Sequence, residues 1–282
     1  MAIQQDSRTG LQAYDFMAPA NSEQAELALE VGARLDVGIK RKYKPNEDSL
    51  LVTRGIMPST ALPQPFTLMS IADGMGGLAH GQEASRLATQ SLAAYIGYAL
   101  NTHEMLPRAM LPLLIAGVQH ANDVVFQHNL SRGDTMGTTL TATLVMAGIA
   151  YVVQVGDSRC YLYRPPVGLQ QITRDHSMVA LLVEAGIIER SAVYTHPARN
   201  QIYRCLGEQA LVEVDGYTLS LAANDILLLC SDGLWEMVHD PQLASLLSAS
   251  SLDPSIIARK LVQAALTNGG EDNISAIVAR AA

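Results

Sequence analysis

The sequence predicts an α+β sandwich built as a single domain. Strand-like segments occur toward both ends of the chain, paired helical stripes occur in its middle and near its C-terminus, and no repeat, linker or low-complexity stretch divides it. Its 282 residues can form one large or two small domains, and one is the simpler assumption. Hydrophobic residues make up 49% and charged residues 16%, which is the balance of a packed protein with a sizeable core.

The N-terminal half is predicted to begin with an arm and to continue with strands and two helices. Residues 1–28 are expected to form an arm outside the core, because the segment starts without apolar periodicity. From Leu29 to Gly38 apolar and polar residues alternate, as is typical of a half-buried strand. We expect further strands at 49–53 and 66–72, a tight glycine-rich loop at 73–77, and helices with apolar residues every three or four positions at 84–99 and 111–125.

The C-terminal half is predicted to return to strands and to end in helices and a last strand. Ala147-Gly148 between two apolar segments indicates a hairpin, and the Asp-Pro pairs at Asp240 and Asp253 each indicate a helix start with Asp as the N-cap. Gly269 suits a helix end. Residues 175–207 are less regular and are expected to form a mobile lobe. The expected strands are 139–144, 149–155, 161–164, 169–173, 211–221, 226–230 and 274–279.

Charge and apolar patterning argue against several classes of partner. A formal net charge of −8 disfavours a nucleic-acid backbone or an anionic membrane, since both attract basic surfaces. The longest apolar runs, such as 226–230, are far too short to cross a bilayer, and the N-terminus lacks a signal pattern, so we expect a cytoplasmic protein. Three widely spaced cysteines indicate neither a disulfide framework nor a zinc site. Nothing in the sequence demands more than a monomer.

Four aspartates share a local context. Asp73, Asp157 and Asp232 each follow an apolar strand-like run, Asp272 precedes one, and each has a glycine within two residues. One such aspartate is more often a plain turn residue, but four in the same context are expected to meet at one edge of the sheets. Carboxylates so close repel one another unless cations lie between them. Oxygen ligands without a Cys or His cluster favour magnesium or manganese over zinc.

Six short motifs occur in an order that is similar to that of a known family. The chain resembles the type 2C (PPM) metal-dependent protein phosphatases, including their bacterial serine/threonine phosphatases, from about Val31 to Val278. A single three-letter match is weak, whereas six in sequence are specific. The motifs are Asn46-Glu47-Asp48, Asp73-Gly74-Met75-Gly76-Gly77, Met136-Gly137-Thr138-Thr139, Gly156-Asp157-Ser158-Arg159, Ser231-Asp232-Gly233 and Asp272-Asn273-Ile274.

The resemblance implies a fold, an activity and a set of site residues. The implied fold is a four-layer α-β-β-α sandwich, with two mostly antiparallel sheets flanked by helix pairs and a metal cleft at one end. The implied substrates are phosphorylated proteins, the products of serine/threonine kinases, which suggests a role in signal transduction. Two Mn²⁺ or Mg²⁺ ions and a weaker third are implied. Asp73 would bridge two ions, Gly74 would give its carbonyl to one, Asp232 and Asp272 would complete the other, Glu47 and Asp48 would act through coordinated waters, and Asp157 would share the third ion with Asp232.

The implied mechanism is hydrolysis without a covalent intermediate. Two divalent ions roughly 4 Å apart lower the pKa of a bridging water toward neutrality and offset charge on the phosphoryl oxygens. By resemblance, Arg41 corresponds to the family's phosphate-binding arginine, although the spacing from Arg41 to Asn46 is two residues longer than the family's. Lys42 and Lys44 are alternatives, for which a solvated basic loop is the simpler interpretation.

Two further regions depart from the family pattern or add to it. Some relatives carry a histidine proton donor where Met75 stands, and a methionine cannot fill that role. His80 and His176 are weak candidates to replace it, because a lone loop histidine is more often a polar surface residue. Residues 175–207 resemble the family's flap beside the active site, and the alternative is an ordinary proline-bearing surface loop.

Two rival functions remain open on sequence grounds. The first is a catalytically silent relative that binds phosphoproteins or senses metal, which the presence of every expected carboxylate disfavours. The second is a two-metal nuclease or small-molecule phosphatase, since similar carboxylate sites act on several phosphate esters. The acidic net charge speaks against a nucleic-acid substrate.

Overall fold

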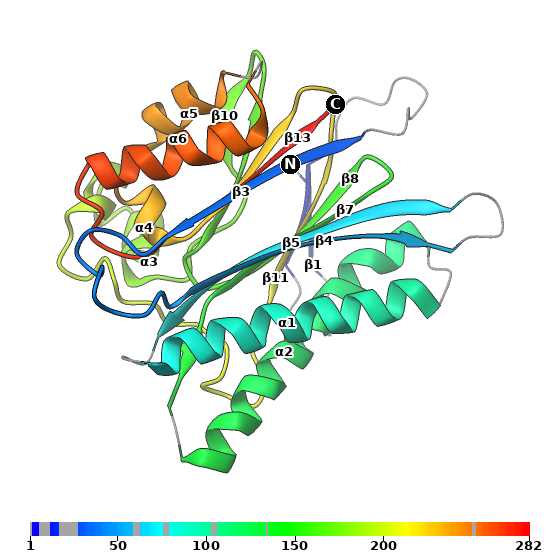
Figure 1. Cartoon of the computed structure of the whole chain (residues 1–282), viewed down its shortest axis with the longest axis horizontal. Helices are drawn as coiled ribbons and strands as arrows, with labels where there is room; N and C mark the ends of the chain where they lie inside the picture. Colours follow the sequence, from blue (N-terminus) through cyan, green and yellow to red (C-terminus); the bar gives the residue numbers. More distant parts are fainter. Residues whose placement is uncertain are drawn as a thin grey trace.

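Two β-sheets lie face to face in the centre of the molecule, and helices cover their outer faces (Figure 1). The computed structural model describes residues 2–5, 12–16, 28–58, 63–75, 79–102, 106–133, 135–249 and 252–282. The predicted α-β-β-α sandwich is confirmed. Helices α1 (Ala79–Thr102) and α2 (Met110–Arg132) cover the larger sheet, while α5 (Asp240–Leu247) and α6 (Pro254–Thr267) cover the smaller one.

The larger sheet has, among the described residues, the strand order β1-β2-β11-β8-β7-β5-β4, with β6 paired to β5. Neighbouring strands are antiparallel except β2 and β11, which run parallel. Strands β1 and β2 belong to the predicted N-terminal arm, and they extend the sheet beyond β11. The strands are β1 (Ala2–Gln5), β2 (Gln12–Phe16), β4 (Asp48–Met57), β5 (Gln64–Met75), β6 (Gly137–Thr138), β7 (Leu140–Met146), β8 (Ile149–Val155) and β11 (Asp215–Ser220).

The smaller sheet is antiparallel throughout its described strands, in the order β10-β9-β12-β13-β3. Its central strand β12 is buried on both faces, which explains its continuous apolar run. Ile226, Leu228 and Cys230 face α5 and α6, whereas Leu227 and Leu229 pack between the sheets. The strands are β3 (Leu29–Asp36), β9 (Arg159–Arg164), β10 (Gly168–Gln171), β12 (Ile226–Cys230) and β13 (Ile274–Ala281).

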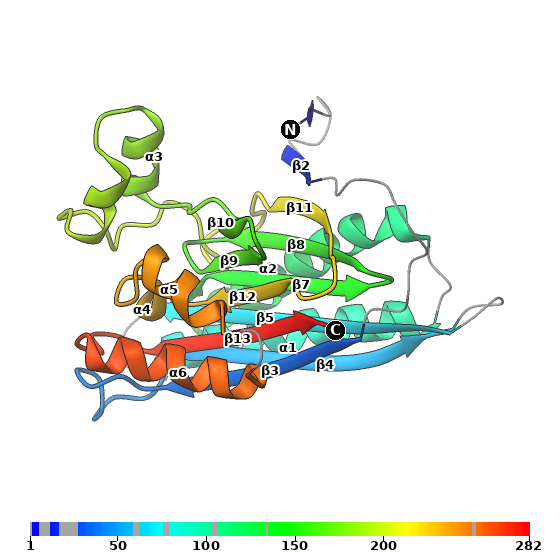
Figure 2. The ribbon, with the colours of Figure 1, turned by 90° about the horizontal axis from the view of Figure 1, so that it is seen from above.

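The segment 175–207, predicted to be irregular, contains a helix and a 3-10 turn. They are α3 (Met178–Glu184) and η2 (Arg190–Tyr194). Figure 2 shows that α3 stands away from the stacked sheets. We call residues 175–207 the flap segment. Two other short elements complete the described chain, η1 (Pro107–Ala109) before α2 and α4 (Asp232–Trp235) directly after β12.

Two sequence predictions about element boundaries are wrong. Strand β5 runs through Met75, so the expected loop does not begin at Asp73, because β6 pairs with Gly74 and Met75 and keeps them extended. Residues 211–214 lie outside β11, although Val212 and Val214 are buried against the helices of the larger sheet. Alternating apolar residues indicate that side chains are buried, and a buried residue need not pair with a neighbouring strand.

The predicted helix starts have different outcomes. Asp253 caps α6, since its carboxylate accepts a hydrogen bond from the Ser255 N–H at 2.7 Å, as predicted. Asp240 lies inside α5 instead, and His239 occupies the N-cap position. The Ala147-Gly148 hairpin between β7 and β8 is confirmed, with positive φ at both turn residues.

One helical stretch among the described residues, Pro107–Arg132, is long and apolar enough to cross a membrane by length and composition alone. The expectation that all apolar stretches are too short therefore fails for this helix. Its apolar side, which includes Leu114, Val118 and Val125, packs on the larger sheet.

Candidate active site

Acidic side chains from both sheets converge at one end of the sandwich. Asp48 begins β4 and lies directly opposite Asp73 near the end of β5. Asp232 follows β12, and Asp272 stands two residues before β13, the neighbour of β12. Asp157 follows the end of β8. The predicted convergence of strand ends is confirmed.

Asp48 is held by the opposite sheet. The hydroxyls of Ser231 and Ser275 donate to Asp48 Oδ2 at 2.7 Å and 2.5 Å. Ser231 follows β12 and Ser275 lies in β13, so these bonds join the ends of the two sheets. Asp48 is buried, and the bonds fix its carboxylate within the site.

The backbone of Asp73 is fixed by the Thr138-Thr139 pair. Thr139 Oγ1 accepts a hydrogen bond from the Asp73 N–H at 2.9 Å, and Thr138 Oγ1 donates to the Asp73 carbonyl at 2.9 Å. The Thr139 N–H donates to the same carbonyl at 2.9 Å. The Met136-Gly137-Thr138-Thr139 motif therefore positions Asp73 rather than contributing a ligand.

Arg41 lies among the acids. Its guanidinium pairs with Glu47 and, through Nη1, with Asp272 Oδ1 at 2.6 Å. The Glu47 N–H donates to Asn273 Oδ1 at 2.8 Å, which ties the Asn46-Glu47-Asp48 motif to the Asp272-Asn273 motif. Arg41 Nε is buried and has no hydrogen-bond partner among the residues that the structure describes.

Burial and mutual repulsion raise the pKa of the clustered carboxyls. The pKa of Asp48 is raised to about 7, because burial and the charges of Asp232 and Asp272 together outweigh the bonds from the two serines. The pKa of Asp73 lies well above its usual range, mainly through burial and then the charge of Asp232. Burial and Asp232 likewise raise the pKa of Asp157. The pKa of Asp232 is raised by burial and by Asp272. The site therefore holds more negative charge than it can carry ionised at neutral pH without cations.

Several features of the site fit divalent cations. Three buried carboxylate oxygens, Glu47 Oε1, Asp48 Oδ1 and Asp232 Oδ1, have no hydrogen-bond partner within the part of the chain that the structure describes. Helix α1 approaches the site at Gly81, where a Cβ would lie 2.6 Å from Glu47 Oε1 and 2.7 Å from the Gly74 carbonyl oxygen. The lack of a side chain at Gly81 thus leaves room around two candidate ligand atoms.

The described residues contain no group of three His, Cys, Asp or Glu side chains arranged to hold an ion by themselves. Magnesium and manganese sites in proteins keep several waters and use backbone carbonyls as well, so such a group is not required. The donor set is made of hard oxygen atoms, which suits these metals.

The structure brings all eight predicted site residues to this end of the sheets. Gly74 joins them because its N–H donates to the Glu47 carbonyl at 3.1 Å. Lys42 and Lys44 are exposed, which agrees with a solvated loop, and the Lys42 ammonium lies over the Tyr43 ring. The eight residues are Arg41, Glu47, Asp48, Asp73, Gly74, Asp157, Asp232 and Asp272.

The two candidate histidines lie in different surroundings. His80 is exposed near the start of α1. His176 is only 1% exposed, so its interpretation as a polar surface residue is wrong. Its Nδ1 accepts a hydrogen bond from the Gly156 N–H at 3.0 Å, which leaves this nitrogen no proton to donate.

Sequence reasoning assigned no role to four residues that support the site. Ser231, Ser275 and Asn273 hold Asp48 and Glu47, and the first and last belong to motifs that the sequence singled out. Glu236 lies one helical turn after Asp232, and burial and then Asp232 raise its pKa to about 7. The four-residue spacing from Asp232 was the available signal for Glu236.

A family model for protein phosphatase 2C matches residues 40–266. The serine/threonine phosphatase stp of Listeria monocytogenes serotype 4b is 35% identical over 217 residues, which cover 76% of this chain and 84% of the relative. The serine/threonine protein phosphatase PstP of Mycobacterium tuberculosis is 36% identical over 256 residues, which cover 90% of this chain and 45% of the relative.

Solved structures agree with this relationship. The crystal structure of Mycobacterium tuberculosis PstP superimposes with a TM-score of 0.76 at 35% identity, and covers 90% of this chain and 98% of that one. The PstP catalytic domain crystallised in complex with two manganese ions gives a TM-score of 0.73 at 34% identity, with coverage of 90% and 98%. With these matches and the acidic cluster at the ends of its two sheets, the chain belongs to the protein phosphatase 2C family of serine/threonine phosphatases.

Proposed function

We propose that this phosphatase removes phosphate from phosphoserine and phosphothreonine in proteins with Mn²⁺ or Mg²⁺ bound among its clustered carboxylates. The observation that carries the proposal is the cluster itself, in which neighbouring aspartates from both sheets repel one another and several buried carboxylate oxygens have no hydrogen-bond partner among the described residues. Two manganese ions in the related PstP catalytic domain support the metal requirement.

The ligands can be proposed residue by residue. Asp73 would contact two ions, the Gly74 carbonyl would bind one of them, and Asp232 and Asp272 would bind the other. Glu47 and Asp48 would act through water, and Asp157 with Asp232 would hold a weaker third ion. When bound, the cations would lower the pKa of water that attacks phosphorus and would offset charge on the phosphoryl oxygens.

Arg41 is proposed to bind the substrate phosphate. A guanidinium can donate to two phosphate oxygens side by side. The buried Arg41 Nε–H is a donor with no acceptor among the described residues. Its pairs with Glu47 and Asp272 place it beside the proposed ligands. Cations among the carboxylates would take over the neutralisation of Glu47 and Asp272, and would free the guanidinium for the phosphate.

The partners and location belong to the same proposal. We infer phosphoprotein substrates of serine/threonine kinases, a signalling role, a cytoplasmic location and a monomeric state. Cys160, Cys205 and Cys230 are buried and free, which is compatible with a reducing compartment. The net charge of −8 disfavours nucleic acid as a substrate.

The test compares manganese-dependent phosphate release from a phosphothreonine peptide, single-stranded DNA and a sugar phosphate. We expect the peptide to be cleaved fastest, with loss of activity in chelator. Asp73→Asn should lower the rate by at least about 100-fold, as removal of an electrostatic stabiliser of the transition state does. Faster cleavage of DNA or sugar phosphate than of peptide would overturn the assignment, and a wild-type chain inactive on all three would indicate a silent relative.

A further inference from the structure

Two consecutive residues at the base of the flap segment, Asp175 and His176, contact opposite ends of the segment that carries Asp157. Both are buried, at 7% and 1% exposed. Residues 156–158 join β8 to β9, whose first residue is Arg159, and the flap segment begins a few residues after β10. The two residues therefore connect the flap segment to a proposed ligand-bearing loop.

His176 holds the first end of this loop at two points. Its backbone N–H donates to the Gly156 carbonyl at 2.9 Å, and its Nδ1 accepts from the Gly156 N–H at 3.0 Å. The bond from Gly156 favours the tautomer with the ring proton on Nε2, which lies 3.3 Å from Asp215 Oδ2 in β11 and 3.0 Å from Arg204 Nη1. His176 thus bonds both backbone polar groups of Gly156, whose carbonyl also accepts from Gln154 Nε2 at 2.8 Å.

The far end of the flap segment returns to the same place. The Tyr203 N–H donates to the His176 carbonyl at 2.9 Å. Arg204 Nη1 donates to Asp215 Oδ1 at 2.8 Å, so Asp215 contacts the flap segment at both of its ends. Burial would raise the pKa of Asp215, but His176 and Arg204 outweigh it and lower the pKa below its usual value.

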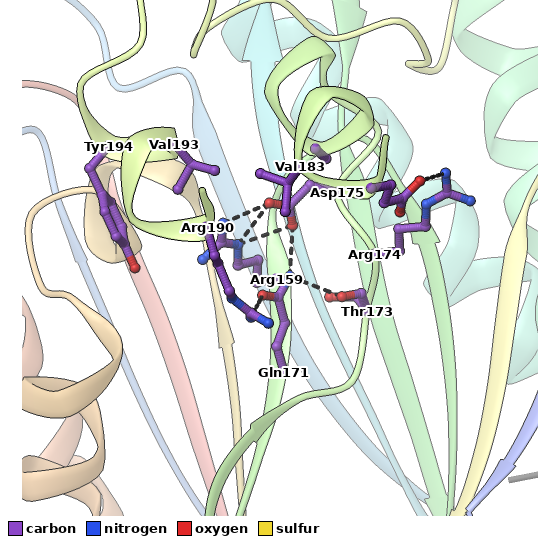
Figure 3. Close-up of a pocket in the computed structure, with 11 residues that line it drawn as sticks. Arg159, Gln171, Thr173, Arg174, Asp175, Val183, Arg190, Val193 and Tyr194 are labelled. Atoms are coloured by element: carbon purple, nitrogen blue, oxygen red, sulfur yellow. Dashed lines mark hydrogen bonds and ion pairs between the residues drawn. The ribbon is translucent and has the colours of Figure 1, made fainter. Parts of the chain in front are cut away.

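Asp175 holds the second end of the loop. Its two carboxylate oxygens share the Arg159 Nε proton, each at 3.0 Å, and Oδ2 also accepts from Arg159 Nη2 at 2.6 Å (Figure 3). The Arg159 guanidinium also stacks 3.5 Å from the centre of the Trp235 ring. The Trp235 indole N–H in turn donates to the Asp157 carbonyl at 3.0 Å.

The rest of the flap segment meets the smaller sheet around a cavity. This cavity of about 240 Å³ is lined by Val183 of α3, Val193 of η2, Arg159 and Gln171 (Figure 3). Tyr194 of η2 adds a ring contact to Trp235 at 6.3 Å between centroids. The direct hydrogen bonds from the flap segment to Gly156 and Arg159 come from its base, at Asp175 and His176.

We propose that Asp175 and His176 are positioning residues, which fix Asp157 toward Asp73 and Asp232 and couple its position to the flap segment. The inference rests on the proposed function, because Asp157 matters to hydrolysis only if it serves the phosphate-cleaving centre. The position of Asp157 itself is a structural property and can be measured without activity.

The test distinguishes the contact that His176 makes through Nδ1 from the one that it makes through Nε2. In His176→Asn, the amide oxygen can replace Nδ1 and still accept from Gly156. In His176→Gln, the amide nitrogen can replace Nε2 and reach Asp215, while the Gly156 N–H loses its acceptor. His196→Gln is a matched control, since His196 Nδ1 also accepts from a backbone N–H, that of Ala198 at 3.1 Å, but within the flap segment.

The readouts are kcat and KM on the phosphothreonine peptide, the melting temperature, and the fluorescence of Trp235 in chelator. Trp235 is the only tryptophan in the chain and is 2% exposed, so its emission reports directly on the Asp157 loop. We expect His176→Gln to lower kcat by roughly tenfold or more, as loss of a residue that orients a ligand does. Its Trp235 emission should shift to longer wavelength, while His176→Asn and His196→Gln stay close to wild type.

The proposal fails if His176→Gln leaves kcat and Trp235 emission unchanged. It also fails if His176→Asn and His176→Gln lose activity only in proportion to a lower melting temperature, because His176 would then be a packing residue. A wild-type chain without phosphatase activity would overturn the proposed function instead, and the fluorescence comparison alone would then decide whether His176 positions the loop.

Discussion

Asp48 illustrates which part of the site could be predicted and which could not. Its carboxylate belongs to a short motif, so its place in the site could be inferred from a few neighbouring residues. The serines that hold it lie 183 and 227 residues further along the chain. Such partners follow from the way the two sheets stack, which no local pattern encodes. The acids were therefore predictable, and most of their supporting hydrogen bonds were not.

Arg41 permits a test of phosphate binding with a single side chain. We expect Arg41→Ala to lower kcat/KM on the phosphothreonine peptide by roughly 10- to 100-fold, because a charge-assisted bidentate contact is lost. Arg41→Lys should recover only part of this, since an ammonium keeps the charge but not the planar pair of donors. Steady-state kinetics at saturating manganese measure the effect. Lys42→Ala is the control, and an equal loss in that variant would contradict the specific role of Arg41.

The strands and helices show a similar division between local and distant causes. The β7–β8 hairpin was predicted because its turn and its alternation lie within one short segment. The extension of β5 to Met75 was missed, since the glycine-rich sequence favours a loop and only pairing with β6 keeps it straight. The helix and 3-10 turn of the flap segment were missed as well, because they are short and present little apolar periodicity.

The turn after β8 requires a glycine because its φ is positive and Thr139 lies close to it, and both causes can be measured. Gly156 has φ +100°, and a Cβ there would lie 2.5 Å from Thr139 Cγ2. Gly168 has nearly the same φ, +103°, with nothing within 4 Å of an added Cβ. We expect Gly168→Ala to destabilise by about 1 kcal/mol and Gly156→Ala by roughly 2–4 kcal/mol, because only the second adds a steric clash. Chemical denaturation measures both, and equal effects would refute the close approach of Thr139.

In the molecule as a whole, the clustered carboxyls that would bind cations also lower the stability of the fold when no cation is bound. Carboxyls that repel one another are retained at the junction of the two sheets, where they cost stability in the absence of cations. This arrangement makes stability depend on both pH and metal. The fold class and the site residues followed from the motif series, whereas the strength of this coupling depends on burial, which only the structure shows.

The pH dependence of the metal-free protein follows from the raised pKa values. Asp48 and Glu236 have pKa values raised to about 7 in the folded state, against ordinary values of 3.8 and 4.5 for the free side chains. Between about pH 4.5 and 7 the folded state therefore binds more protons than the unfolded state, and stability falls as the pH rises. We expect the melting temperature in chelator to decrease from about pH 5 to 7.5, and manganese to raise it most at the higher pH.

The asparagine variant of Asp48 provides the control for this effect. Asp48→Asn removes one titrating group and one negative charge, so its melting temperature in chelator should fall less over the same pH range. A wild-type melting temperature that rises steadily with pH in chelator would mean that the carboxyls do not repel one another in the folded protein.

Counting bound manganese tests the convergence of these carboxylates most directly. In a calorimetric titration of the chelator-treated and dialysed protein near neutral pH, we expect two ions to bind each chain, with a further weak site at higher concentration. Asp73→Asn should bind fewer than two, because Asp73 is the proposed shared ligand. A wild-type chain that binds fewer than two ions, or an Asp73→Asn variant that binds them as the wild type does, would contradict a two-ion centre at this end of the sheets.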